Sequence, residues 1–114
     1  MENQFLRTEM VLGADGMDAL RRSHVAVFGL GGVGSYTAEC LARSGIGELT
    51  IVDNDVVPPS NRNRQLEALA STVGQEKTAA VAVRLQDIHP GLRLHPICAT
   101  YDAAHREEFF SRKF

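Results

Sequence analysis

The chain has 114 residues, which is enough for one domain with a single hydrophobic core. Its formal net charge of −2 excludes a protein that grips nucleic acid through bulk positive charge, although a local basic patch would still allow an RNA substrate. No apolar run approaches the roughly 20 residues of a membrane span, and the first residues lack the apolar centre of a signal peptide. We therefore expect a cytoplasmic protein with no membrane partner.

The hydrophobic pattern alternates between the periods of strands and helices. Apolar runs predict buried strands over 24–28 and 49–52, and a third strand is predicted over 92–98. Apolar residues at helical spacing predict helices over 15–22, 35–43, 76–88 and 102–113. The segment 54–65 contains two prolines and several polar residues, so we expect a loop there. This order of elements predicts an α/β fold, the N-terminal half of a Rossmann-like, doubly wound and mostly parallel sheet.

The cysteines and histidines show no spacing that predicts a special site. Cys40 falls in an apolar helical stretch and Cys98 at a strand end, so we expect both to be small buried hydrophobic residues. The histidines stand singly in the sequence, without an acid or hydroxyl partner at an informative spacing. We expect structural or surface roles for all of them: His24, His89, His95 and His105.

A glycine-rich loop lies between the first predicted strand and the helix that follows it. Gly29, Gly31 and Gly34 form the pattern G-x-G-x-x-G, in which the first allows a tight turn and the second lets the backbone approach a phosphate. The third packs the helix against the strand. Asp53 ends the next strand, where an acid can bind ribose hydroxyls. These features predict an adenine nucleotide site, and taken alone they would also fit an NAD-dependent oxidoreductase.

The segment after Asp53 carries cationic side chains that a dinucleotide site does not require. Arg64 lies in the loop, and Lys77 lies at the start of the next predicted helix. Hydride transfer needs no such cations beside the diphosphate, whereas attack at an α-phosphate builds charge on phosphoryl oxygens that Arg and Lys stabilise. We expect Arg62 to be a solvated surface charge. Arg64 and Lys77 therefore favour ATP chemistry over NAD chemistry, and a solvated surface charge is the alternative for each of them.

Five segments in order resemble the ThiF/MoeB/HesA family of ubiquitin-activating-enzyme-like proteins. They are Gly29–Gly34, Gly45–Gly47, Leu49–Asp55, Ser60–Gln65 and Val73–Lys77. The likeness extends over almost the whole chain. It implies an adenylation domain that activates a carboxylate with ATP and magnesium, of which residues 1–114 would form the N-terminal portion.

The resemblance implies roles for the matched residues. Asp53 would contact the ribose, Lys77 would bind phosphate, and polar residues of the loop would line the triphosphate. The expected nucleotide-binding set is Gly29, Gly31, Gly32, Gly34, Asp53, Asp55, Ser60, Asn61, Arg64, Gln65 and Lys77. Arg64 and Lys77 would be catalytic, together with Arg7, which would reach into the partner subunit's site of a homodimer. For Asp55, a simple role in the turn is the alternative.

Within this family, the segments Arg7–Gly13 and Ala26–Ser35 look most like the tRNA threonylcarbamoyladenosine dehydratases. In those enzymes ATP activates the threonyl carboxylate of the modified base, and cyclisation then releases AMP with a net loss of water. Sulfur-carrier-protein adenylyltransferases have a similar N-terminal half and are the alternative, with a sulfur carrier and a sulfur-relay protein as partners. An NAD-dependent oxidoreductase and a non-catalytic nucleotide-binding or dimerisation module are the alternatives from other classes.

Some features depart from the family pattern. Pro58 and Pro59 stiffen the loop, and Arg62 stands where many members have an apolar or small residue. The aspartate that binds magnesium in the family is expected beyond Phe114, and so is the second half of the sheet. We therefore expect a truncated domain that has no metal ligands of its own and is inactive alone.

Overall fold

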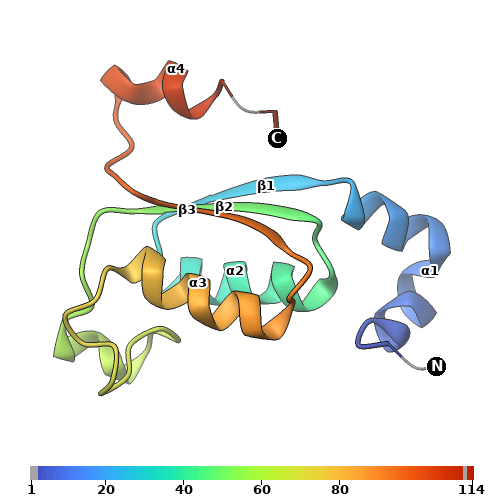
Figure 1. Cartoon of the computed structure of the whole chain (residues 1–114), viewed down its shortest axis with the longest axis horizontal. Helices are drawn as coiled ribbons and strands as arrows, with labels where there is room; N and C mark the ends of the chain where they lie inside the picture. Colours follow the sequence, from blue (N-terminus) through green and yellow to red (C-terminus); the bar gives the residue numbers. More distant parts are fainter. Residues whose placement is uncertain (1–2, 112) are drawn as a thin grey trace.

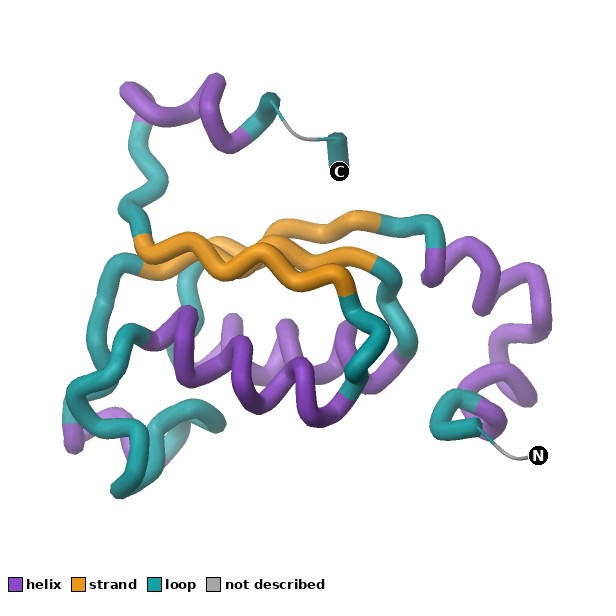
Figure 2. Tube along the Cα trace, viewed as in Figure 1, coloured by secondary structure: helices purple, strands orange, loops and turns teal. Residues whose placement is uncertain are grey.

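A sheet of three parallel strands forms the centre of the computed structural model, which describes residues 3–111 and 113–114. The strands are β1 (His24–Phe28), β2 (Glu48–Asp53) and β3 (Arg93–Cys98), in the order β1-β2-β3. Helices α2 (Gly32–Ser44) and α3 (Lys77–Ile88) connect the strands, and both lie against the same face of the sheet (Figure 1, Figure 2). The predicted Rossmann-like α/β fold with a parallel sheet is confirmed.

The main core lies between the sheet and these two helices. Every second residue of a strand faces the same side, so only alternate strand residues enter the core. The buried contacts come from Val27, Leu49 and Ile51 in the sheet, Ala38 and Ala42 in α2, and Val81 and Leu85 in α3. Full burial of a side chain such as Leu49 stabilises the fold by about 1.5–3 kcal/mol. The small alanines of α2 allow that helix to approach the strands closely.

The first helix, α1 (Leu6–Arg21), is longer than the helix predicted over 15–22. It has a kink at Gly13, whose φ of 76° and ψ of 169° are not helical. Met10 and Val11, before the kink, are exposed, so this half of α1 buries no apolar face that a sequence pattern could reveal. Met17, after the kink, is buried. None of the described helices is long and apolar enough to cross a membrane.

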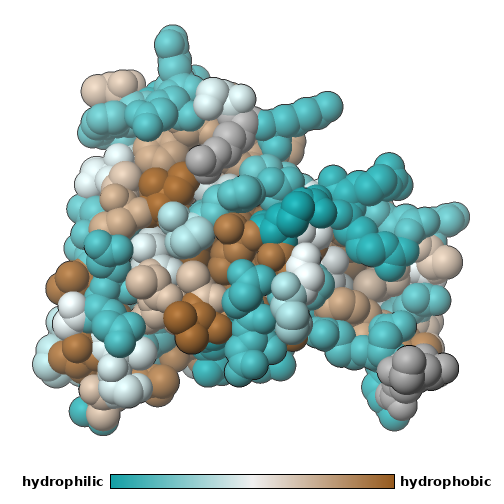
Figure 3. All heavy atoms as spheres, viewed as in Figure 1, coloured by the Kyte–Doolittle hydropathy of each residue, from teal (hydrophilic) through white to brown (hydrophobic). Residues whose placement is uncertain are grey.

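The opposite face of the sheet carries aromatic side chains and the C-terminal segment. The ring centroid of Phe28 lies 4.8 Å from that of Tyr101 and 5.6 Å from that of Phe109. The segment forms a 3₁₀ turn, η2 (Ala103–His105), and a short helix, α4 (Arg106–Phe109), on this side of the sheet (Figure 1). Figure 3 shows apolar surface between α3 and this segment, along the β3 edge.

The helix predicted over 102–113 is therefore wrong in its length. The described part of this region contains only a 3₁₀ turn and a helix of 4 residues, and Arg112 lies outside the described residues. So short a helix has little stability of its own. Burial of Phe109 against Phe28 of β1 and against Tyr101 holds it in place instead.

Both cysteines are exposed, so the prediction that they are buried is wrong. Cys40 lies on the outer side of α2, whereas Ala38 and Ala42 of the same helix face the core. Cys98 is the last residue of β3, at an edge of the described sheet. An apolar stretch of sequence fixes which element forms but not which side of it each residue occupies.

Candidate functional site

The glycine loop connects β1 to α2 in a conformation that two of its glycines make possible. Gly29 has a φ of 88°, in the left-handed region that favours glycine, and its N–H donates to the Val52 carbonyl oxygen at 2.8 Å. A Cβ atom on Gly34 would lie 1.8 Å from the Gly29 carbonyl oxygen, which no rotation of a side chain could relieve. The predicted roles of these two glycines, a tight turn and close packing of helix on strand, match this geometry.

The amino terminus of α2 offers its backbone to a ligand. Its N-cap is Gly31, and no side chain there accepts a hydrogen bond from the first turn. The Ser35 hydroxyl turns back instead and donates to the Gly31 carbonyl oxygen at 2.7 Å. Unsatisfied N–H groups and the positive end of the helix dipole favour an anion at this position.

Asp53 joins the end of β2 to the glycine loop. Its Oδ2 atom accepts a hydrogen bond of 2.7 Å from the Leu30 backbone N–H, and its Oδ1 atom accepts one of 2.8 Å from the Asp55 backbone N–H. The carboxylate thus fixes two backbone segments, a role beyond the ribose contact expected of it. Each carboxylate oxygen has a second lone pair, so a ribose hydroxyl can still be bound.

The loop after β2 brings Arg64 and Gln65 over the glycines. A Cβ atom on Gly32 would lie 3.9 Å from the Cδ atom of Arg64, and one on Gly31 would lie 3.8 Å from the Nε2 atom of Gln65. A 3₁₀ helix, η1 (Pro59–Asn63), shapes this loop. Two motifs that are far apart in the sequence therefore form one surface.

The guanidinium of Arg64 is held by the same loop. It donates to the Ser60 carbonyl oxygen at 3.3 Å, to Asn63 Oδ1 at 3.0 Å and to the buried Asn61 Oδ1 at 3.4 Å. Arg62 is exposed on η1, as expected for a surface charge. The two arginines are only two positions apart, but only Arg64 lies against the glycine loop.

Lys77 is a buried cation at the start of α3, and its side chain is 7% exposed. Its backbone N–H donates to the Asp55 carbonyl oxygen at 3.0 Å, and its Nζ atom lies 3.9 Å from Asp55 Oδ2. Asp55 in turn is bonded to Asp53. Lys77 is therefore linked through two aspartates to the glycine loop, and its burial shows that it is not a solvated surface charge.

Glu67 is an acidic residue of this region whose burial the sequence analysis did not predict. It is 2% exposed, and neither carboxylate oxygen has a hydrogen-bond partner among the described residues. Burial raises the pKa of Glu67, while the charge of Lys77 opposes that shift. The residue is buried because Val57, Ala68 and Ala80 pack together and draw the loop onto α3. An acid in a polar loop gives no sequence signal of such burial.

Arg7 lies apart from the other predicted site residues. It is exposed on α1, which precedes β1, whereas the glycine loop follows β1 at the other end of the strand (Figure 1). Within this chain, the structure therefore does not bring Arg7 to the nucleotide site.

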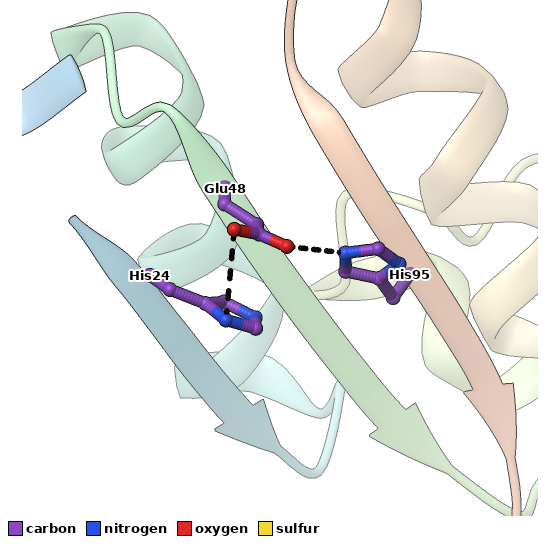
Figure 4. Close-up of side chains that lie close together, drawn as sticks. All are labelled: His24, Glu48 and His95. Atoms are coloured by element: carbon purple, nitrogen blue, oxygen red, sulfur yellow. Dashed lines mark hydrogen bonds and ion pairs between the residues drawn. The ribbon is translucent and has the colours of Figure 1, made fainter. Parts of the chain in front are cut away.

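Three of the histidines have polar partners that the sequence analysis did not identify. His95 Nε2 lies 2.7 Å from Glu48 Oε2 (Figure 4), and His24 Nε2 lies 2.7 Å from the Thr50 hydroxyl. His105 Nδ1 lies 2.7 Å from Asp102 Oδ1. The first two contacts cross between strands, so linear spacing could not reveal them. The third contact joins residues only three positions apart, so the sequence could have indicated it.

A strand, a glycine loop and a helix, with an acid at the end of the next strand, together define a Rossmann-like nucleotide-binding domain. The ThiF family model matches residues 4–113, and the chain belongs to the ThiF family. This confirms the resemblance that the sequence motifs indicated.

The relatives include two kinds of enzyme. The tRNA threonylcarbamoyladenosine dehydratase of Bacillus subtilis is 46% identical over 110 residues, which cover 96% of this chain and 43% of that protein. The molybdopterin-synthase adenylyltransferase of Escherichia coli is 40% identical over 90 residues, which cover 79% of this chain and 36% of that protein.

A crystal structure agrees with this relationship. The Escherichia coli tRNA N6-threonylcarbamoyladenosine dehydratase in complex with ATP matches with a TM-score of 0.95 and 34% identity, covering 97% of this chain and 46% of that one. The chain therefore spans less than half the length of these relatives.

Proposed function

We propose that this chain is the nucleotide-binding part of an enzyme that uses ATP to adenylate a carboxylate, with threonylcarbamoyladenosine in tRNA as the acceptor. The observation that carries the proposal is a pair of cations, Arg64 over Gly32 at the uncapped start of α2 and buried Lys77 against Asp55. The dehydratase and adenylyltransferase relatives support the same chemistry.

Each part of the site has a role in this reaction. The N–H groups at the start of α2 bind phosphate oxygens, and Asp53 binds the ribose while holding Leu30. Attack by the carboxylate joins its oxygen to the α-phosphorus and breaks the bond to pyrophosphate, so negative charge grows on the phosphoryl oxygens. Arg64 and Lys77 offset that charge. Attack of the threonylcarbamoyl group on its own activated carbonyl then closes the ring and releases AMP.

ATP fits the described residues, but a magnesium site does not. The glycine loop leaves room for a phosphate, and buried Lys77 supplies its counter-charge. Asp53 already bonds two backbone N–H groups, and Asp55 faces Lys77, so these aspartates do not form a free pair for Mg²⁺. We propose that magnesium accompanies ATP through ligands outside the described residues, where it would neutralise phosphate charge.

The choice of nucleotide is the first test. We expect calorimetry on this chain to show tighter binding of ATP than of NAD⁺, because the cations flank the phosphates. Preferential binding of NAD⁺ would overturn the adenylation proposal in favour of an oxidoreductase. ATP binding without adenylate formation, in a protein completed with the C-terminal part of a relative, would favour a non-catalytic module.

The acceptor needs a second test, because the relatives act on different acceptors. Residues 1–110 can be fused to the remaining part of the Bacillus subtilis relative, and that relative itself is the positive control. With ATP and tRNA carrying threonylcarbamoyladenosine, we expect AMP release and a nucleoside lighter by one water in mass spectrometry. AMP formation only with a sulfur carrier protein would identify the adenylyltransferase branch. We propose a cytoplasmic location for the enzyme, in keeping with a tRNA as its acceptor.

We further propose a homodimer in which Arg7 acts in the partner subunit's site. The support is the place of Arg7 on α1, at the end of the sheet away from the glycine loop. In the fusion protein, Arg7→Ala and Lys77→Met subunits should each be inactive, while their mixture regains part of the activity through hybrid sites. Subunit exchange without recovered activity would exclude this role in trans.

A further inference from the structure

Three side chains of metal-ligating types meet near the amino-terminal ends of the strands, on the face of the sheet away from α2 and α3. His24, Glu48 and His95 come from β1, β2 and β3 (Figure 4). The parallel register pairs His24 with Glu48 and Thr50 with His95. Side chains alternate along a strand, so all three project from the same face. Their ligand atoms all lie within 4.8 Å of one another.

The carboxylate of Glu48 lies between the two imidazoles. Its Oε2 atom is 2.7 Å from His95 Nε2, and its Oε1 atom is 3.8 Å from His24 Nδ1 (Figure 4). The contact with His95 lowers the pKa of Glu48, so the carboxylate is ionised at neutral pH. The three side chains are between 10% and 39% exposed, and His24 and Glu48 border a surface hollow that also includes Arg22 and Phe114.

We propose that His24, Glu48 and His95 form a binding site for a divalent transition-metal ion of the zinc type. Two imidazole nitrogens and a carboxylate oxygen are a donor set that zinc takes in proteins, with water in the fourth position. Metal–ligand distances of about 2.0–2.1 Å in a tetrahedron place neighbouring donors about 3.3 Å apart. The separations of the donor atoms here lie on both sides of that value, so small side-chain rotations bring them into place.

Thr50 supplies the hydrogen bond that orients His24 as a metal ligand. The Thr50 hydroxyl lies 2.7 Å from His24 Nε2, and it accepts the Nε2–H when Nδ1 carries the lone pair for the metal. The Lys113 carbonyl oxygen lies 2.9 Å from the same Nδ1 atom. The metal replaces that contact, and the carbonyl either turns away or becomes an oxygen ligand.

Neighbouring positive charges oppose the site. Arg93 Nη2 lies 3.7 Å from Glu48 Oε1, and Arg22 and Lys113 border the same hollow. These cations weaken the binding of a metal ion without blocking any of the three ligands. Because Arg93 is largely exposed, it can be replaced without disturbing the core.

The test is calorimetric titration of the 114-residue chain with Zn²⁺, repeated with Co²⁺ to record the visible absorption of a tetrahedral site. We expect one Zn²⁺ per chain, with a dissociation constant of about 1 μM or below at pH 7.5. His95→Asn and Glu48→Gln should each weaken binding at least tenfold, because each removes one of three ligands. His105→Asn is the matched control: it removes a histidine that also contacts an acid but has no third ligand nearby among the described residues, and it should change nothing.

Loss of Zn²⁺ binding can also result from a variant that fails to fold, so the test includes a variant that should bind Zn²⁺ more tightly. Arg93→Gln should tighten Zn²⁺ binding by about tenfold, since it removes a cation beside Glu48. Absence of Zn²⁺ binding by the unaltered chain would overturn the proposal, whatever the variants do. Equal losses in His95→Asn and His105→Asn would also overturn it, because they would indicate unspecific binding. The cluster and the glycine loop lie at opposite ends of the strands, so either proposal can fail without the other.

Discussion

The backbone N–H of Leu30 donates to Asp53 Oδ2 at 2.7 Å, which ties the glycine loop to the end of the neighbouring strand. Leu30 is fully buried, so water cannot replace this partner. The other carboxylate oxygen holds Asp55, which contacts Lys77. Asp53 is thus the junction between the phosphate loop and the cationic side of the site, and loss of its charge should disturb both.

Asp53→Asn should destabilise the fold by about 1.5–3 kcal/mol, the value of a hydrogen bond to a charged group. The amide offers one oxygen where the carboxylate offers two, so either Leu30 or Asp55 loses its acceptor. Urea denaturation followed by circular dichroism measures the change. Asp87→Asn, at an exposed position of α3, is the control and should stay within about 0.5 kcal/mol of the original chain. Equal effects of the two substitutions would contradict the structural role of Asp53.

Gly34→Ala should destabilise the chain by about 3 kcal/mol or more and weaken ATP binding. The added Cβ would lie 1.8 Å from the Gly29 carbonyl oxygen, so the loop and α2 must separate. Gly91→Ala is the matched control, because its Cβ would approach nothing closer than a carbon of His89 at 3.5 Å. Thermal melting and calorimetry on both variants separate the fold from the site. An unchanged melting temperature of the Gly34→Ala chain would contradict the close contact between Gly34 and the Gly29 carbonyl group.

The first two strands could be predicted because their apolar runs are continuous in the sequence. The run 24–28 coincides with β1, and 49–52 lies within β2. The position of Asp53 at a strand end follows from the same pattern, and so does the placement of the glycine loop before α2. Such features depend on neighbours along the chain, which a sequence displays directly.

Contacts across the fold could not be predicted in the same way. Glu48 meets His24 and His95 only because the parallel register aligns three strands. Glu67 is buried only because the loop folds back onto α3. The family resemblance predicts that Arg64 acts at the nucleotide, but it does not predict the position of Arg64 over Gly32. That position depends on the 3₁₀ helix η1, which the prolines of the sequence only partly indicate.

Glu67 should make the chain less stable at neutral pH than at mildly acidic pH. Burial raises the pKa of Glu67 in the folded chain above the ordinary value of about 4.3. Between these two pKa values the folded chain binds more protons than the unfolded chain, so stability falls as pH rises through that window. Glu67→Gln should remove this fall and make the chain more stable than the original chain at pH 7.5, because the buried amide carries no charge to desolvate.

Denaturation at several pH values measures the effect of Glu67. The control is Glu107→Gln, at an exposed position of α4, which should leave the stability at neutral pH unchanged. A Glu67→Gln chain that is less stable than the original at pH 7.5 would mean that the carboxylate has a favourable partner when ionised, with Lys77 the first candidate.

Arg64 and Lys77 should affect the transition state more than the binding of ATP. The carboxylate and the α-phosphate bring two anions together, so the site must offset more charge at the transition state than in bound ATP. Cations placed for that moment raise turnover rather than ground-state affinity. Arg64→Ala or Lys77→Met in the fusion protein should lower carboxylate-dependent ATP–pyrophosphate exchange by about a hundredfold or more. ATP affinity should fall by much less.

Arg62→Ala is the matched control, an exposed arginine on the same loop, and should leave both quantities unchanged. A collapse of ATP affinity with a normal rate at saturating ATP would mean that these residues only hold the nucleotide.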